Sequence, residues 1–215
     1  MKQFAVIGLG RFGTGVAKTL NTMGYEVLVI DDDQERIQEV INDVTHAIQA
    51  DAKDEQALKA LGIRNFDVVI VAIGQDMQAS ILVTVLLKEL GVKCVVTKAQ
   101  TELHGKVLAK VGADKVVFPE RDMGARLAHS LVSSNVLDHI ELSPDHSILE
   151  VVAPDILVGK TLKESALRAK YKITIMAIKR GGEIIVSPSP EDPIRENDIL
   201  VAIGDNDNLR RIERE

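Results

Sequence analysis

The chain has 215 residues, more than one average domain and fewer than two, so we expect one full domain followed by a smaller one. Apolar residues make up 46% and charged residues 27% of the chain, which is typical of a folded globular protein and excludes a disordered one. The net charge is -6, and the chain has no Trp, 2 Tyr and 4 Phe. Neither a basic surface nor a set of base-stacking aromatic residues is available, which argues against a nucleic-acid-binding protein.

The sequence also argues against a membrane-spanning or secreted protein. The longest uncharged apolar stretch, 77–87, is shorter than the roughly 18 residues that span a bilayer. The first strand-like run starts at residue 3, which leaves no room for a signal peptide. The single cysteine, Cys94, lies in an apolar run, so we expect it to be a buried small hydrophobic residue. We therefore expect a cytoplasmic protein without disulfides.

Between residues 4 and 118, short β-branched runs alternate with helical patterns of roughly 10 to 17 residues. The runs are FAVIGLG, EVLVIDDD, THAIQAD, DVVIVAIG, KCVVTKA and DKVVFPE. Strand, helix and strand at this spacing indicate parallel βαβ units. Helices are predicted over 54–61 and 78–90, each followed by a glycine. The fold class of this half is α/β, a Rossmann-like doubly wound parallel sheet of about six strands.

After the segment 121–135 the pattern changes to that of a small α+β unit. Strands are predicted over 148–152, 174–179, 183–186 and 199–203, with a short helix over 161–168 and a last helix from residue 205. Gly181 and Gly182 lie between two apolar runs, which is a hairpin signal. We place the boundary near residue 140, which gives a first domain over 1–140 and a smaller second domain over 141–215.

A nucleotide-binding fingerprint follows the first predicted strand. Gly8-Leu9-Gly10-Arg11-Phe12-Gly13 stands between that strand and a helical pattern, which is the context the motif requires. Gly8 allows the tight turn, Gly10 lets the backbone approach a pyrophosphate, and Gly13 lets helix and strand pack closely. The phosphates would then lie at the start of the helix, where free N–H groups and the helix dipole favour anions.

The second strand ends in Asp31-Asp32-Asp33, where a Rossmann fold keeps the carboxylate that binds the ribose hydroxyls. Asp31 is the expected ribose ligand, and a carboxylate there repels a 2′-phosphate and favours NAD or an adenosine nucleotide over NADP. The alternative, which fits Asp32 and Asp33, is that these residues begin the next helix. We include Asp32 and Phe12 in the expected site as members of the two motifs.

Arg11 and the pair Asp51-Ala52 extend this site. Arg11 starts the helix after the glycines, where its guanidinium can reach phosphate oxygens, and it gains more from a triphosphate than from NAD. This indicates ATP or ADP as the ligand; the alternative is a solvated arginine. Asp51 and Ala52 end the third strand where an adenine would lie, or Asp51 caps the helix near residue 54.

The residues expected of an enzyme are missing. A dehydrogenase needs an acid or base beside the nicotinamide and a substrate domain. The five histidines are scattered without metal or acid-base spacing, and the second half shows no catalytic arrangement. We therefore predict a binding or switching protein with no catalytic residues.

A series of motifs occurs in order over the whole chain. In the first half they are FAVIGLGRFG, Asp31, QADA at 49–52, RNFDVVIVAIG at 64–74, QAS at 78–80, LLKELG at 86–91, KAQ at 98–100, GAD at 112–114 and PERDMG at 119–124. In the second half they are GKTLKE at 159–164, LRAKY at 167–171, IMAIKRGGEI at 175–184 and ENDILVAIG at 196–204. With these motifs the sequence resembles the regulators of potassium conductance (RCK), and within that family the cytosolic regulatory subunits of bacterial Ktr/Trk-type potassium uptake systems. The resemblance makes 1–140 the nucleotide-binding domain and 141–215 the regulatory domain.

The resemblance implies a ring of eight subunits, built from dimers, on a membrane-embedded potassium channel subunit at the inner face of the membrane. ATP would activate relative to ADP, and NAD or NADH would compete for the same cleft. The residues it places at the nucleotide are Gly8, Gly10, Arg11, Gly13, Asp31, Asp51, Ala52 and Lys98. Glu120 would help to hold a Mg, Ca or Na ion at the ATP phosphates and is the one expected metal ligand; the alternative is an ordinary first-turn helix acid after Pro119.

The resemblance further implies that the second domain binds cyclic di-AMP at a subunit interface. The residues it places at the apolar floor and the phosphates of that ligand are Leu162, Arg168, Ile173, Ile175 and Pro190. One residue departs from the family, because Lys172 stands where a glycine is usual. If this turn needs a positive φ, the lysine is strained by roughly 1 to 2 kcal/mol.

The leading interpretation is a non-catalytic, nucleotide-regulated potassium-transport subunit. The alternative is a soluble NAD-dependent oxidoreductase or NAD(H) sensor, for which the first half alone would be sufficient. A third is a nucleotide or redox sensor for another partner.

Overall fold

The structure is a computed structural model that describes residues 2–132 and 136–213. The chain divides into two compact units, 1–120 and 121–215, and residue 140, the boundary expected from the sequence, lies within a strand. Within the described residues, no helix has both the length and the apolar character needed to span a bilayer.

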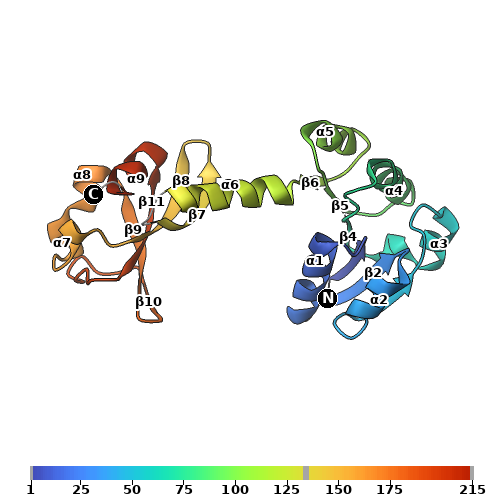
Figure 1. Ribbon diagram of the computed structural model, residues 1–215, viewed down its shortest axis with the longest axis horizontal. Helices are drawn as coiled ribbons and strands as arrows, with labels where there is room; N and C mark the ends of the chain where they lie inside the picture. The colour runs from blue at the N-terminus through green and yellow to red at the C-terminus, as the bar shows by residue number, and fades with distance from the viewer. Residues whose placement is uncertain (1, 133–135, 214–215) are drawn as a thin grey trace. The chain divides into compact units, whose positions relative to one another are not determined.

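The first unit is a six-stranded parallel sheet with the order β3-β2-β1-β4-β5-β6, as predicted (Figure 1). Its strands are β1 (Gln3–Ile7), β2 (Glu26–Asp31), β3 (His46–Gln49), β4 (Val68–Val71), β5 (Val95–Lys98) and β6 (Lys115–Val117). The helices are α1 (Arg11–Thr22), α2 (Gln34–Val40), α3 (Glu55–Ala60), α4 (Met77–Glu89) and α5 (Glu102–Lys110), with a 3-10 turn, η1 (Ile63–Asn65). The order reverses where β1 pairs with both β2 and β4, which is the point at which such sheets bind ligands.

Two apolar cores, one on each face, hold this sheet between helices. Ala5 and Ile7 of β1 belong to one core with Leu58 of α3 and Leu87 of α4. Val6 belongs to the other core, together with residues of α1 and α2. Strands that bury both faces read as nearly continuous apolar runs, which is why the sequence predicted this half well. Cys94, expected to be buried, is half-buried and lies just before β5 begins.

Local signals explain where several helices begin and end. The carboxylates of Asp33, Asp54 and Asp76 each accept a backbone N–H in the first turn of α2, α3 and α4, respectively. Gly62, which follows α3, has φ +65°, a left-handed conformation that suits glycine. Asp33 therefore starts a helix, as one interpretation held, whereas the cap of α3 is Asp54 and not Asp51.

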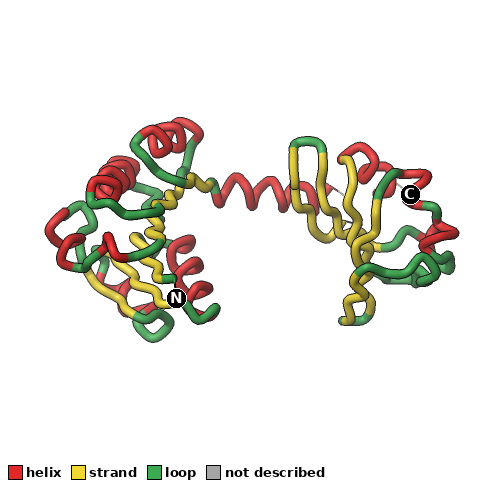
Figure 2. Tube along the Cα trace, turned by 180° about the vertical axis from the view of Figure 1, so that it is seen from behind, coloured by secondary structure: helices red, strands yellow, loops and turns green. Residues whose placement is uncertain are grey.

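The second unit is built on a five-stranded antiparallel sheet with the order β10-β9-β11-β8-β7. Its strands are β7 (Val136–Ser143), β8 (His146–Val152), β9 (Thr174–Arg180), β10 (Glu183–Val186) and β11 (Ile199–Asp205). Its helices are α7 (Leu162–Ser165), α8 (Leu167–Tyr171) and α9 (Asn206–Glu213), with a 3-10 turn, η2 (Asp155–Leu157); α6 (Pro119–Val132) runs from the end of the first unit into the second. Figure 2 shows the strands in yellow and the helices in red.

The Gly181-Gly182 pair forms the predicted hairpin between β9 and β10, with φ +54° and +91° and Arg180 opposite Glu183. The core joins Leu149 and Ile178 of the sheet to Leu167 of α8 and Ile212 of α9. Strand β7, which pairs with β8, was not predicted from the sequence.

Candidate functional site

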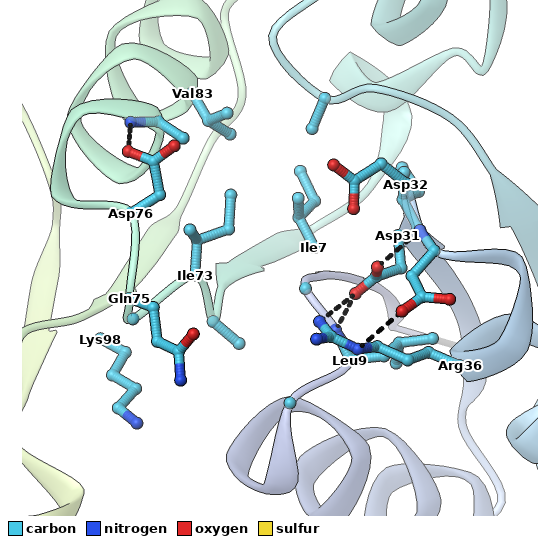
Figure 3. Close-up of a pocket in the computed structure, with 18 of the residues that line it drawn as sticks. Ile7, Leu9, Asp31, Asp32, Arg36, Ile73, Gln75, Asp76, Val83 and Lys98 are labelled. Carbon is cyan, nitrogen blue, oxygen red and sulfur yellow. Dashed lines mark hydrogen bonds and ion pairs between the residues drawn. The ribbon is translucent and has the colours of Figure 1, made fainter.

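A cleft of about 750 Å³ lies at the carboxyl ends of the strands of the first unit (Figure 3). This volume is within the range of small-molecule and cofactor sites. Its lining comes from the ends of β1, β2, β3, β4 and β5, from the starts of α1 and α4, and from Glu120 in the first turn of α6. The lining includes all the residues that the sequence places at the nucleotide except Gly13.

The glycine-rich loop has the geometry that the fingerprint predicts. Gly8 has φ +95°, and its N–H donates to the Ile30 carbonyl at 2.8 Å. A Cβ added to Gly13 would lie 1.9 Å from the Gly8 carbonyl oxygen, so only glycine lets helix and loop approach this closely. A Cβ added to Gly10 would meet nothing within 4 Å. Gly10 is also the N-cap of α1, so no side chain caps the first-turn N–H groups.

The Asp31 side chain is 3% exposed and is turned toward the glycine-rich loop. Its carboxylate accepts the Leu9 N–H at 2.5 Å and the Asp33 N–H at 2.9 Å, and it lies 3.7 Å from the Arg36 guanidinium. Asp32 is exposed, and Figure 3 shows its carboxylate pointing into the cleft. Asp31 thus fixes the loop, while Asp32 presents a free carboxylate on the side where ribose is expected.

Positive charge gathers at the other side of the cleft. Arg11, the exposed first residue of α1, makes no hydrogen bond or ion pair within the described part of the chain. The Lys98 ammonium lies 2.5 Å from a Glu120 carboxylate oxygen and 5.8 Å from the centre of the Phe12 ring. The hydrogen bond from Lys98 holds the pKa of Glu120 below its ordinary value, with a smaller contribution from Arg11. Glu120 lies in the first turn of α6 and also lines the cleft. Its position is therefore compatible with both interpretations, a cation ligand and an ordinary first-turn acid.

Asp51 and Ala52 follow β3 and line the cleft, Ala52 with an exposed fraction of 8%. Asp51 accepts the Lys53 N–H at 2.9 Å and lies 3.6 Å from the Lys53 ammonium. Both residues therefore stand at the third strand end, where the sequence places the adenine.

The sequence missed several residues of the cleft. Arg36 enters it from α2, and Gln75 and Asp76 enter it after β4. The signal for Gln75 and Asp76 was available, because the carboxyl ends of parallel strands meet at one edge and these residues follow a buried strand. Asp76 also caps α4, which accounts for it structurally.

In the described ranges, no group of three or more His, Cys, Asp or Glu side chains is close enough to hold a metal ion. The side chains of these residues therefore do not form a metal centre by themselves. Glu120 could supply one carboxylate oxygen, and the other ligands would have to come from phosphates or water. The residues thus fit a cation that arrives with a nucleotide rather than one held by the protein alone.

Of the residues predicted for cyclic di-AMP, Ile173 belongs to the core of the second unit, and Leu162 and Ile175 pack against that core. The backbone N–H of Lys163 on α7 donates to the Pro190 carbonyl at 2.8 Å, which ties α7 to the proline-rich loop. Leu162 and Ile175 are half-buried at the edge of the core, and Arg168 is exposed on α8. Ile173 is fully buried, so it would support an apolar floor from behind rather than form its surface.

Lys172, which ends α8, has φ +54°. The turn therefore does require the left-handed conformation, and the condition for strain at this lysine is met.

Comparison with protein families matches both halves of the chain. Residues 4–119 match the TrkA-N domain and residues 147–215 match the TrkA-C domain. The Ktr system potassium uptake protein C of Bacillus subtilis is 53% identical over 213 residues, which cover 99% of this chain and 96% of that protein. The Ktr system potassium uptake protein A of the same organism is 50% identical, covering 100% of this chain and 96% of that protein.

Solved structures with a similar fold include RCK domains. The GsuK RCK domain matches with a TM-score of 0.70 and 20% identity, covering 99% of this chain and 47% of that chain. The GsuK channel bound to NAD matches with a TM-score of 0.54 and 26% identity, covering 100% of this chain and 38% of that chain.

Proposed function

We propose a function from one premise: the chain belongs to the family of Ktr system potassium uptake proteins, with a TrkA-N domain followed by a TrkA-C domain. This membership confirms two predictions from the sequence, the family itself and the assignment to a protein that is not an enzyme. The NAD-dependent oxidoreductase is thereby set aside.

The proposed function is that of a cytoplasmic regulatory subunit which binds an adenine nucleotide and controls a membrane-embedded potassium channel subunit. The subunits would form a homo-octameric ring built from dimers, at the inner face of the membrane. ATP would hold the ring in its activating shape, and ADP in another. Because a ligand shifts a two-state equilibrium only by its differential affinity for the two states, the terminal phosphate must make the difference.

The observation that carries this proposal is the pairing of an uncapped helix start with an exposed arginine. The first-turn N–H groups of α1 have no side-chain cap, and the side chain of Arg11, in the same turn, makes no hydrogen bond or ion pair within the described residues. An anion is the ligand that satisfies both groups. A phosphate bound there would lie at a cleft large enough for an adenosine, and the lining of that cleft also includes Asp32 and Asp51.

NAD is a second candidate for the same cleft. It is supported by the similarity to a channel that was solved with NAD, and by the carboxylates at the end of β2, which disfavour a 2′-phosphate. ATP is favoured over NAD by Arg11, because a triphosphate carries more charge near that side chain. A Mg, Ca or Na ion would enter with the phosphates and take Glu120 as its protein ligand.

Calorimetric titration of the nucleotide-stripped protein with ATP, ADP and NADH, with and without Mg²⁺, tests this function. We expect ATP to bind most tightly, and Arg11→Ala to weaken ATP by about tenfold or more while bringing it close to ADP. Arg64→Ala is the matched control, since Arg64 is exposed on η1 and lies outside the cleft. Tight binding of NADH with hardly any binding of ATP would contradict the proposal.

For the second unit we propose cyclic di-AMP as an inhibitory ligand. The hydrogen bonds that join α7 to the Pro190 loop place Leu162 near that loop, and Arg168 supplies an exposed cation on α8. Arg168→Ala should weaken cyclic di-AMP by about tenfold, whereas Lys170→Ala on the same helix should not. Equal losses in the two variants would refute a specific role for Arg168.

Native mass spectrometry would test the octamer, and flotation with vesicles that contain a Ktr-type channel subunit would test the partner. Binding to these vesicles but not to empty ones is the expected result. A ring that binds nucleotides and ignores the channel would favour a sensor for another partner.

A further inference from the structure

The turn between β5 and α5 forms part of the wall of the cleft. Lys98, the last residue of β5, and Gln100 in the turn both line the cleft. A Cβ added to Gly74, which follows β4, would lie 3.4 Å from the Lys98 ammonium and 3.5 Å from the amide nitrogen of the Gln100 side chain. Both side chains therefore reach the end of the neighbouring strand, and the backbone of this short turn determines where two polar groups of the cleft lie.

His104 of α5 is joined to this turn by two hydrogen bonds. Thr101, the N-cap of α5, accepts the His104 N–H with its hydroxyl at 3.1 Å. In return, the Nδ1 atom of His104 accepts the Gln100 N–H at 3.4 Å. The arrangement resembles a capping box, in which the third residue of a helix returns a hydrogen bond from its side chain to the backbone at the helix start. It requires an Nδ1 atom without a proton, because a protonated ring nitrogen cannot accept.

The Gln100 N–H needs this acceptor because the pairing of the sheet ends one residue earlier. The last residue pair of β5 and β6 is Lys98 with Val117, and the Ala99 N–H still donates to the Val117 carbonyl at 2.9 Å. The Gln100 N–H comes next along the chain, and the His104 ring accepts it. Loss of this acceptor would therefore release the turn just after its last hydrogen bond to the sheet.

The His104 ring is fully buried, and its Nε2 atom has no hydrogen-bond partner among the described residues. Since Nδ1 is the acceptor, Nε2 carries the proton of the neutral ring. A buried ring with one unpartnered nitrogen is less favourable in this place than an apolar side chain of similar size. The hydrogen bond at Nδ1 is therefore what this residue provides and an apolar one could not.

Burial lowers the pKa of His104 below 6.5, with no contribution from the charges around it. Helix α5 packs against α4 and β6. The charged residues of α5, of these two neighbours and of the end of β5 are Lys88, Glu89, Lys98, Glu102, Lys106, Lys110 and Lys115. Lys88 is paired with Asp114, and Lys98 with Glu120. The ring is therefore neutral above about pH 6.5, and a proton taken up below that pH would turn Nδ1 into a donor that faces the Gln100 N–H.

We infer that His104 is a positioning residue for the nucleotide cleft: its unprotonated Nδ1 holds the turn of Lys98 and Gln100, and nucleotide affinity falls when substitution or protonation removes this acceptor. The inference rests on the proposed function and adds to it a dependence on pH. His104 does not line the cleft, so it acts through the backbone of Gln100 rather than on the ligand.

Two substitutions separate this role from a purely structural one. His104→Asn keeps an acceptor near the position of Nδ1 and cannot titrate, whereas His104→Leu fills the space without an acceptor. In calorimetric titrations of the full chain with ADP at pH 7.5, His104→Leu should bind about three- to fivefold more weakly, the loss expected for one hydrogen bond. His104→Asn should bind within about twofold of the unaltered chain. Thermal unfolding identifies the folded variants, and a purely structural role predicts normal affinity for each of them.

The same titrations at pH 5.5 test the effect of protonation. The terminal phosphate of ADP also titrates in this range, so the unaltered chain is compared with His104→Asn, which meets the same ligand. We expect the ratio of the two affinities to shift by about twofold or more against the unaltered chain between pH 7.5 and pH 5.5. His46→Asn is the matched control, since His46 is exposed on β3 and outside the cleft, and it should follow the unaltered chain.

Equal ADP affinities of the unaltered chain and a folded His104→Leu would overturn the inference and leave the proposed function standing. If His104→Leu does not fold, the pH series of His104→Asn decides, and a ratio that is the same at both pH values overturns the dependence on pH. Failure of the unaltered chain to bind either ADP or ATP would overturn the proposed function as well.

Discussion

In the first unit, every described residue with a left-handed backbone is a glycine, whereas the second unit places four other residues in that conformation. The glycines are Gly8, Gly24, Gly62, Gly91 and Gly112. The exceptions are Ala166, Lys172, Ser187 and Asn197, with φ between +50° and +63°. In the first unit, each left-handed position thus holds the residue that suits it. In the second unit, the backbone is strained at positions that hold other residues.

The positions of the strained residues show a pattern. Ala166 and Lys172 flank α8, which carries Arg168, and Ser187 and Asn197 flank the loop that carries Pro190. Strained backbone is retained where the surrounding structure enforces it, and it gathers at ligand sites and switches. The turns of the unit that contains the nucleotide cleft are therefore relaxed. The strained backbone lies around the segment proposed to bind the second ligand.

Gly13→Ala should destabilise the first unit, and we expect it to have the largest effect on stability of all the substitutions. Its Cβ would lie 1.9 Å from a backbone oxygen that cannot move aside, so we expect a loss of about 3 kcal/mol or more. Hydrogen exchange followed by mass spectrometry should show loss of protection in the first unit and not in the second, which has its own core.

The matched control is Gly10→Ala, for which the added Cβ meets nothing. That variant should fold normally and lose nucleotide affinity, because the methyl group occupies the place expected for phosphate. Similar stabilities of the two variants would contradict the close contact.

Asp198→Asn should destabilise the second unit. Asp198 is 1% exposed, and it accepts two hydrogen bonds from the Arg180 guanidinium and one from the Arg195 N–H. Removing a buried charge from such a pair leaves the arginine uncompensated and should cost about 2 to 4 kcal/mol. Chemical denaturation monitored by hydrogen exchange would place the loss in the second unit.

An exposed pair in the same unit serves as the control. Lys163 and Glu191 lie 3.3 Å apart, and both are 69% exposed, so Glu191→Gln should change stability by less than about 1 kcal/mol. A loss as large as that of Asp198→Asn would mean that burial does not decide the strength of these pairs.

Lys172→Gly should remove backbone strain from the second unit. Relief of the left-handed conformation, less the entropy that glycine loses on folding, should stabilise the second unit by about 0.5 to 1 kcal/mol. Lys170→Gly, inside α8, should destabilise it by a similar amount. Thermal unfolding of the two variants gives the sign directly, and a loss of stability in both would show that Lys172 is not strained.

The pH dependence of the first unit should show the smallest effect. His104 is fully buried, its Nδ1 accepts the Gln100 N–H, and its Nε2 has no hydrogen-bond partner in the described structure. Burial lowers its pKa below 6.5, because the charged ring is poorly solvated there. The folded state therefore resists protonation, and stability is full above about pH 6.5 and falls as the pH drops through the lowered pKa.

We expect a measurable loss of stability between pH 7 and pH 5.5. His104→Leu should flatten this dependence when denaturation is measured at both pH values.

In the second unit, burial raises the pKa of Asp198, but the hydrogen bonds from Arg180 and Arg195 outweigh it and lower the pKa below 3.8. The stability that this carboxylate provides is present above about pH 4 and is lost in more acidic solution.

Much of the first unit could be predicted because one local pattern repeats. Apolar strands, helix signals and the glycine motif agree with each other, and six strands and the cleft follow from them. What could not be predicted is which charges meet: Lys98 and Glu120 are 22 residues apart, and their contact depends on how β5 and α6 are placed.

The second unit was predicted less completely. Strand β7 was missed although a strand signal was available: Ile140 and Leu142 alternate with polar residues before the Pro144-Asp145 turn that joins β7 to β8, but this alternation spans only four residues. Ile173 was expected at a ligand surface but is buried, since a motif fixes the identity of a residue and not the face on which it lies. The strain at Lys172, by contrast, followed from the missing glycine alone.

The strand orders impose a sequence of events on the folding of the nascent chain. In the first sheet the central strand β1 is made before the other strands of that sheet, and it lacks one neighbour until Val68–Val71 has been made. In the second sheet the central strand is β11, Ile199–Asp205, which bonds to both β8 and β9 and is the last strand to be made. The second unit therefore completes its sheet only after its last strand has been made, so removal of residues 199–215 should leave the nucleotide cleft intact and take the middle strand out of the second sheet.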